Sequence, residues 1–210
     1  MKIDILTIFP EMFEGVLGTS IIGRATGTGV VEIKIHNLRD WSDDNYKSVD
    51  DRPFGGGAGM VMRVDVVDKA LKDLKTPETK VILLDTKGEM YNQKAAETLK
   101  NEKHLILISP HFEGIDHRVH EHLADKVYSI GPYVLSGGEL PSMVLVDSIV
   151  RLLPGALGNP QSLAEESYSE EFETEYPQYT RPAEYKDWKV PEILLSGDHK
   201  KIADWRKGKK

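Results

Sequence analysis

The chain has 210 residues, of which 40% are hydrophobic and 29% charged, and this balance excludes a largely disordered protein. It has no cysteine and no apolar run of the ~20 residues that a membrane span needs, so we exclude a disulfide framework, a thiol nucleophile and a membrane partner, and expect a cytoplasmic protein. The net charge of -7 disfavours an extended nucleic-acid surface, although residues 200–210 carry six basic residues against one acid and suit local contact with a phosphate backbone.

The first part of the chain predicts alternating strands and helices. Residues 30–37 alternate apolar and polar side chains, which is typical of a strand, and residues 64–74 have apolar side chains at helical spacing. Between them, residues 38–59 are polar and glycine-rich without a clear period, as in a functional or mobile loop. We therefore expect strands over 2–8 and 30–37, and helices over 9–18, 20–29 and 64–74.

The middle of the chain predicts a parallel sheet. Two short, continuous apolar runs, residues 80–85 and 104–109, are separated by a helical pattern over 93–102. Fully apolar strands that alternate with helices are typical of an α/β fold with helices on both faces of the sheet. Further along we expect a helix over 115–125, a strand over 126–130 and a helix over 142–153.

The composition changes after Gly155, where proline, serine and glutamate become frequent. Residues 165–175 contain six acidic residues and no basic one. We therefore predict three parts: an α/β domain over 1–153, a flexible interdomain linker over 154–177, and a small helical C-terminal domain over 178–210.

A glycine-rich motif, DDRPFGGGAGM, starts at Asp50 and has four glycines in five positions. It lacks the Lys-Ser/Thr ending of a P-loop and does not join a strand directly to a helix. It is either a flexible turn or a loop that wraps a flat substrate, with Asp50 or Arg52 available to that substrate.

A histidine-rich motif, HFEGIDHRVHEH, follows the strand at 104–109. His117 and His120 have the spacing of a metal-binding pair on a helix, but no third ligand is evident, and a solvated helix face is the competing interpretation. The HFEG part is more informative, because ligands of open parallel sheets bind beyond the carboxyl ends of strands.

Three glycine-bearing segments follow the three predicted strands: LLDTKGE, SPHFEGID and SIGPYVLSGGELP. None has the G-x-G-x-x-G spacing of a dinucleotide site, which disfavours a nicotinamide or flavin enzyme. The absence of a P-loop likewise disfavours a kinase. Converging glycine loops without a phosphate-binding lysine suit a ligand held by backbone amides and apolar contacts, such as adenosine.

Together with LTIFPEMFEGV, DSIVRLLPGALGN, PQYTRP and VPEILLSGDH, these motifs closely resemble the bacterial tRNA (guanine-N1)-methyltransferase family, TrmD, of the SPOUT superfamily. The resemblance runs from Met1 to about Trp205. It implies an α/β domain with a deep C-terminal trefoil knot, a shortened tRNA-binding C-terminal domain, and a homodimer with its active site at the subunit interface. The implied reaction is S-adenosylmethionine-dependent methylation of ring nitrogen 1 of the guanosine 3′ of the tRNA anticodon (position 37), supported by Mg2+.

The resemblance also implies roles for individual residues. Glu166 lies in a linker that would close as a lid, and it takes the place of the family's catalytic aspartate. Arg151 would stabilise charge on the base. Without the resemblance, Glu166 is interpreted as a solvated acid of the linker and Arg151 as a cation at the end of a helix. Substitutions such as Pro110 leave open a catalytically weak relative that binds adenosylmethionine or RNA. The substrate-binding residues implied are Asp50, Arg52, Gly55, Gly56, Gly57 and Glu113. The cofactor-binding residues implied are Thr86, Pro110, Phe112, Glu113, Gly114, Ile130, Gly131, Pro132, Tyr133, Val134, Leu135, Gly137, Gly138 and Pro141.

Overall fold

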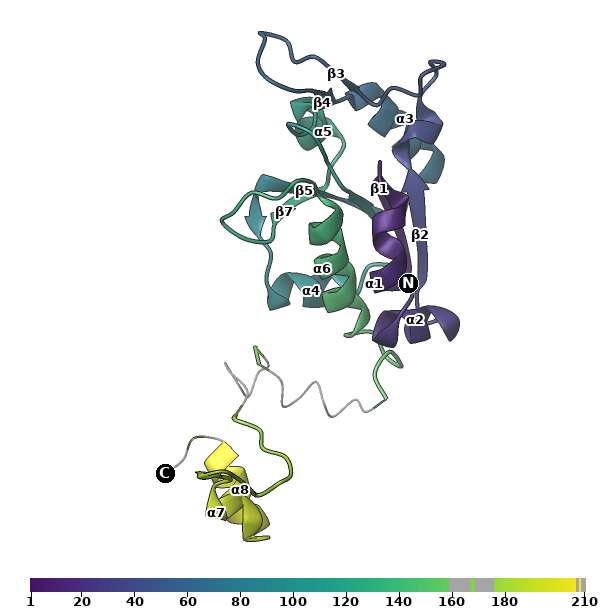
Figure 1. Cartoon of the computed structure of the whole chain (residues 1–210). Coiled ribbons are helices and arrows are strands. Elements are labelled where there is room, and N and C mark those ends of the chain that lie inside the picture. Colours follow the sequence, from purple (N-terminus) through teal and green to yellow (C-terminus); the bar gives the residue numbers. More distant parts are fainter. Residues whose placement is uncertain (159–166, 169–175, 207, 209–210) are drawn as a thin grey trace. The chain divides into compact units, whose positions relative to one another are not determined.

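The computed structural model of the chain describes residues 1–158, 167–168, 176–206 and 208 (Figure 1). It divides into two compact units, Met1–Gly158 and Asn159–Lys210, which are described separately below. Glu165 and Glu166, with much of the predicted linker over 154–177, lie outside the described residues. Within the described ranges, no helix is long and apolar enough to cross a bilayer.

The first unit is built on a parallel sheet of five strands, which confirms the predicted α/β class. The strand order is β2-β1-β6-β5-β7, and every neighbouring pair is parallel. The three strands at one end of this order are β6, β5 and β7; one glycine-bearing segment follows β6, another follows β7, and LLDTKGE lies in the outer part of β5. The strands are β1 (Lys2–Thr7), β2 (Glu32–Asn37), β5 (Thr79–Met90), β6 (His104–Ile108) and β7 (Lys126–Ser129).

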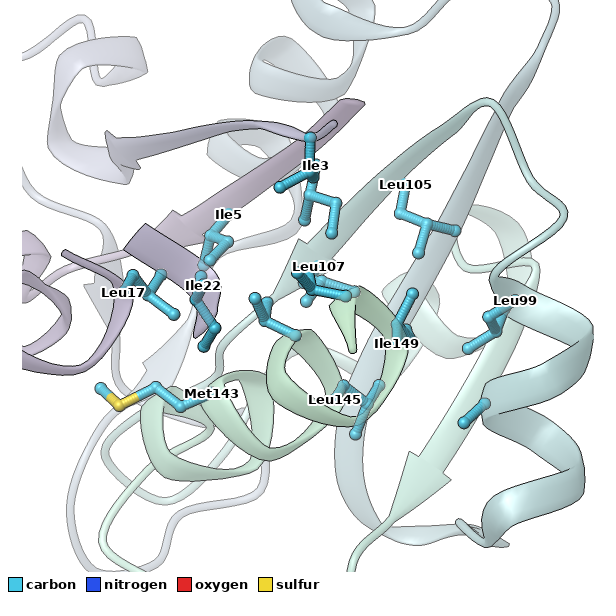
Figure 2. Packing of buried hydrophobic residues seen from close by; sticks show 14 of the residues in the cluster. Ile3, Ile5, Leu17, Ile22, Leu99, Leu105, Leu107, Met143, Leu145 and Ile149 are labelled. Carbon is cyan, nitrogen blue, oxygen red and sulfur yellow. The ribbon is translucent and has the colours of Figure 1, made fainter. Parts of the chain in front are cut away.

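Side chains that alternate along the strands fill two cores, one on each face of the sheet. In Figure 2, Ile3, Ile5 and Leu107 on one face pack against Leu145 and Ile149 of α6. That face is covered by η1 (Pro10–Phe13), α1 (Glu14–Leu17), α2 (Ser20–Gly27), α4 (Gln93–Leu99) and α6 (Glu139–Val150). The opposite face is covered by η2 (Leu38–Trp41), α3 (Val64–Leu74) and α5 (His117–His122).

Strand β5 is longer than predicted. The sequence predicts its end at Asp85, but the strand continues to Met90, and its pairing with β7 shifts between Leu84 and Glu89. Gly88 permits this continuation, because a Cβ atom there would meet the backbone of Tyr128 at 2.6 Å. The polar stretch after Leu84 is therefore an irregular strand segment that wraps the end of β7, and not a simple loop.

Helix α6 begins at Glu139, three residues before the predicted start at Ser142. Gly138 is its N-cap residue, and the Ser142 N–H donates to the Gly138 carbonyl. Pro141 fits within the first turn, where a backbone N–H has no partner inside the helix. The Ser-Gly-Gly-Glu-Leu-Pro segment is therefore a helix start whose first residues face the ends of the neighbouring strands.

The second unit contains short elements, some of which the sequence does not predict. Helices α7 (Glu192–Leu195) and α8 (His199–Arg206) lie within residues 178–210, where the sequence predicts a small helical domain. The antiparallel hairpin of β8 (Glu184–Tyr185) and β9 (Trp188–Lys189) is an addition, and the Lys186 ammonium lies 5.5 Å from the ring centroids of both Tyr185 and Trp188.

Asp4 forms a buried polar cluster on the sheet. Its carboxylate is fully buried, lies 2.8 Å from His36 Nε2 and 2.7 Å from His104 Nε2, and pairs with Lys2 Nζ at 2.6 Å. Burial by itself raises the pKa of the Asp4 carboxyl group, but the hydrogen bonds from His36, Lys2 and His104 outweigh it and keep this pKa below its usual value. The folded state therefore binds a proton on Asp4 less readily than the unfolded state does.

This lowered pKa predicts an acid-sensitive stability. The contribution of Asp4 is fully present above the unfolded pKa, so the free energy of unfolding should fall as the pH drops below about 4. Asp4→Asn should lower that free energy at pH 7 by about 2 kcal/mol and flatten its decline below pH 4. Urea unfolding from pH 7 to pH 3 measures both effects, and Asp68→Asn, which removes a surface ion pair with Lys72, is the control. If the free energy of unfolding falls with pH equally in wild type and Asp4→Asn, the lowered pKa of Asp4 does not cause the acid sensitivity.

Candidate active site

The carboxyl ends of β5, β6 and β7 surround one cavity of about 290 Å³. Because the three strands are parallel and adjacent, the segments that follow them meet at the same edge of the sheet. The lining residues come from residues 84–87 in the outer part of β5, from 110–115 after β6, and from 128–131, 133–138 and Pro141 at and beyond the end of β7. The three segments chosen from the sequence are thus brought together in space.

The predicted cofactor residues can be placed against this cavity. All of them line it except Pro132, which is exposed and lies outside the lining. The cavity also has walls that the sequence does not single out, among them Asp85, Lys87, His111 and Ser136. Their proximity to a strand end is the only sequence signal that could have indicated them.

Gly138 brings the third segment against the end of β6. The Gly138 N–H donates to the Pro110 carbonyl over 2.6 Å, and a Cβ atom on Gly138 would meet the Ser109 Cα at 2.7 Å. Nearby, the hydroxyls of Ser109 and Ser142 lie 2.7 Å apart and are buried. The close approach requires glycine at 138, and it fixes the start of α6 to the second segment.

The second segment has an unusual backbone. Phe112 has a positive φ of 62°, which is a costly conformation for a bulky side chain, and Gly114 follows at 120°. Strained backbone of this kind concentrates at functional sites. The turn exposes the Phe112 ring and places Glu113 at the rim of the cavity.

The glycine-rich loop is joined to this second segment at its base. Strands β3 (Asp50–Asp51) and β4 (Val61–Met62) form an antiparallel pair that carries the loop. The Glu113 N–H donates to the Met60 carbonyl over 3.0 Å, and the Met62 N–H donates to the Gly114 carbonyl over 2.9 Å. Of the predicted substrate residues, only Glu113 lines the cavity. Asp50 lies in β3, and Arg52, Gly55, Gly56 and Gly57 lie in the loop between β3 and β4.

Arg151 lies outside the cavity within one chain. It is the C-cap residue of α6, whose first residues contact the second segment, and its N–H donates to the Asp147 carbonyl. A helix of twelve residues is about 18 Å long. The structure therefore does not bring Arg151 and the glycines at the other end of α6 together in the same chain.

Of the α5 histidines, His120 contacts the first segment through Asp85. His120 Nε2 lies 3.1 Å from Asp85 Oδ2, and Asp85 Oδ1 accepts a hydrogen bond from the Lys87 N–H over 2.9 Å. The rings of His117 and His120 are packed with centroids 4.8 Å apart. Among the described residues, no group of three His, Asp or Glu side chains could hold a metal ion. The metal interpretation of His117 and His120 therefore has no support here.

The cavity suits a ligand that has both a flat ring system and polar or charged groups. Its walls combine backbone at Ile130–Gly131 and Gly137–Gly138 with the aromatic rings of Phe112 and Tyr133 and the aliphatic side chain of Leu135. Cavities that combine apolar walls with fixed polar groups are typical of small-molecule and cofactor sites. An adenosine group fits these walls, because aromatic and aliphatic side chains can pack against its rings while polar groups hydrogen-bond to it.

Comparisons with known proteins agree with this geometry. The family model described as tRNA (guanine-1)-methyltransferase TrmD matches residues 1–210. A protein of Dictyoglomus turgidum named tRNA (guanine-N(1)-)-methyltransferase is 51% identical over 207 residues, which cover 99% of this chain and 84% of that protein. Proteins of the same name from Geobacillus kaustophilus and Bacillus subtilis are each 51% identical, cover 98% of this chain, and are matched over 85% and 86% of their own lengths.

Proposed function

The chain belongs to the tRNA (guanine-1)-methyltransferase family, TrmD, and on that premise we propose that it methylates ring nitrogen 1 of the guanosine 3′ of the tRNA anticodon, at position 37. The methyl donor in this proposal is S-adenosylmethionine. The observation that carries it is the cavity at the ends of β5, β6 and β7, lined by three glycine-bearing segments in a full-length match to the family. Because the substrate is tRNA, we place the reaction in the cytoplasm.

The donor would lie among the three segments. Backbone groups at Ile130 and Gly131 would bind the adenosine, with Phe112 and Leu135 against its faces. Bound there, S-adenosylmethionine supplies an electrophilic methyl group. The protein's part is to fix the position of both reactants, which supplies much of the rate.

The proton on guanine nitrogen 1 sets the chemical task. This nitrogen is a poor nucleophile until its weakly acidic proton leaves. We assign proton acceptance to Glu166 and stabilisation of the charge that develops on the neighbouring carbonyl oxygen to Arg151. Both assignments rest on family membership, since Glu166 lies outside the described residues and Arg151 lies outside the cavity of its own chain.

The position of Arg151 supports a homodimer with a shared active site. About 18 Å along α6 separate Arg151 from the glycines of its own chain. An Arg151 that acts at this cavity would therefore come from a second copy of the chain. The exposed side of α6 supports the same conclusion, because Leu140 and Val144, spaced one turn apart, are 52% and 45% exposed. Val134, which lines the cavity, is also largely exposed.

The knot is likewise part of the proposal. The close approach of Gly138 to Ser109 and Pro110 supports a path in which the third segment passes through the loop that follows β6. Knots are very rare in proteins, so the family membership carries most of this assignment.

The second unit would contact the tRNA, as a C-terminal domain joined by the linker over 154–177. Its basic residues, including Lys200, Lys201 and Arg206, and the aromatic side chains of its hairpin suit a nucleic-acid backbone and bases. Magnesium would enter as a hydrated ion beside the tRNA phosphates, which is how Mg2+ commonly binds, and we assign it no residues.

A transfer assay tests the proposal. The protein is incubated with tritiated S-adenosylmethionine and a tRNA transcript that has guanosine at positions 36 and 37; a transcript with adenosine at position 37 is the control. We expect label on the first transcript alone. Tight binding of S-adenosylmethionine without transfer would favour the catalytically weak relative. Absence of binding would overturn the assignment of the cavity.

A further inference from the structure

A buried carboxylate lies directly behind the glycines of the third segment. Glu139, the first residue of α6, is 1% exposed, although glutamate is rarely buried unless it is paired. The Thr7 hydroxyl at the end of β1 donates to Glu139 Oε1 over 2.9 Å. The other carboxylate oxygen, Oε2, lies 3.3 Å from Nδ1 of His111. Glu139 thus joins the end of β1, the second cavity segment and the start of α6.

His111 is fixed from several sides. Its ring packs edge-to-face against Phe9, with centroids 4.8 Å apart, and its backbone N–H lies 3.1 Å from the sulfur of Met62. The side chain is 21% exposed and forms part of the cavity wall. His111 therefore links the second segment to Glu139 and holds the two at a fixed distance.

These two side chains pack against the α-carbon of Gly137. A Cβ atom on Gly137 would collide with Glu139 Oε2 and His111 Nδ1. Gly137 and His111 both line the cavity, whereas Glu139 does not. The carboxylate and the imidazole therefore pack against the backbone of the third segment where it forms the cavity wall.

A buried carboxylate is costly unless hydrogen bonds and nearby positive potential compensate it. Two polar partners and the N-terminus of α6 provide that compensation here. Both carboxylate oxygens of Glu139 have partners only when β1, the second segment and α6 keep these relative positions. The backbone of residues 136–138 is then fixed before any ligand binds.

We infer that Glu139 and His111 are positioning residues for the methyl-donor cavity: they fix the backbone of residues 136–138, so that their loss weakens donor binding and leaves the chemical step largely intact. The inference rests on the proposed function for the identity of the donor. It assigns no contact between either side chain and the reacting atoms.

The first test measures donor affinity by calorimetry. Glu139→Ala and His111→Ala should each raise the Kd for S-adenosylmethionine about tenfold, the effect of losing a hydrogen bond to a charged group. His111→Gln, which keeps a side-chain N–H, should recover most of the affinity. His122→Ala, which removes an exposed histidine of α5, should leave the Kd unchanged.

Kinetics separate positioning from chemistry. The KM for S-adenosylmethionine should rise with the Kd, while kcat at saturating donor should change by less than about threefold. The double variant Glu139→Ala/His111→Ala should bind the donor no more weakly than the worse single variant, because both act on the same segment.

A donor-free measurement keeps the inference independent of the proposed function. The Gly138 amide, which donates to the Pro110 carbonyl, should exchange with solvent about tenfold faster in His111→Ala than in wild type. If Glu139→Ala does not fold, His111→Ala, at the edge of the cluster, still provides every readout.

Unchanged affinity and unchanged Gly138 exchange in His111→Ala would overturn the inference. So would a loss of kcat with an unchanged KM for the donor. If wild type fails to bind S-adenosylmethionine, the proposed function fails, and the exchange measurement alone decides whether the two side chains fix the segment.

Discussion

Replacing Glu166 by glutamine should lower kcat by about 10²–10⁴-fold while leaving the Kd for S-adenosylmethionine nearly unchanged. Glutamine has a similar size but cannot accept the proton from guanine nitrogen 1. The loss should therefore appear in the chemical step, which single-turnover transfer to a tRNA transcript measures directly. The rate of Glu166→Gln should also keep rising at alkaline pH, as a growing fraction of the guanine loses its proton without help from the protein.

Glu165 provides the matched control, because it is the adjacent carboxylate in the same acidic segment. Glu165→Gln should retain at least half of the wild-type rate. If Glu165→Gln is the impaired variant and Glu166→Gln is active, the base is Glu165. If both retain full activity, neither carboxylate is the general base, and the mechanism needs another proton acceptor.

Arg151→Ala should lower kcat by about 10²–10³-fold, the usual effect of removing a cation or donor that stabilises a developing oxyanion. The Kd for S-adenosylmethionine should not change, because Arg151 does not line the cavity. Arg151→Lys should recover only part of the rate, since an ammonium lacks the planar donor fork of a guanidinium. Arg24→Ala, at an exposed position of α2, is the control and should behave as wild type.

A mixing experiment tests whether Arg151 acts across a dimer. Gly138→Val should inactivate the cavity of its own chain, because a Cβ atom there meets Ser109. Mixed dimers of Arg151→Ala and Gly138→Val contain one site with an intact cavity and an intact Arg151 from the partner copy. Activity should therefore return on mixing two inactive proteins. Persistent inactivity of verified mixed dimers would indicate that each site is built from a single chain.

The fold was predictable from the sequence where one local pattern dominates. The continuous apolar runs at 80–85 and 104–109 predict buried parallel strands, and the structure has them as parts of β5 and β6. The continuation of β5 to Met90 was not predictable, because its residues Asp85 to Gly88 favour a loop locally and only contact with β7 makes them a strand. The hairpin of β8 and β9 was too short to give a period.

The part of the site that lies at the ends of parallel strands was predictable from the sequence. Parallel neighbours end at the same edge, so three segments far apart in sequence were expected to meet, and they do. The polar cluster behind them was not predictable. Thr7 and Glu139 are 132 positions apart, and the general tendency of glutamate to lie at the surface points away from a buried Glu139.

Identification of the modified nucleoside decides whether this cavity serves the methylation of guanine nitrogen 1 in tRNA. After incubation with S-adenosylmethionine, the transcript with guanosines at positions 36 and 37 is cut into fragments, and the methylated fragment is sequenced and digested to nucleosides for mass spectrometry. We expect a single product, 1-methylguanosine, at position 37. A methyl group on another atom or at another position, or unmodified tRNA from protein that binds the donor, would rule out this function.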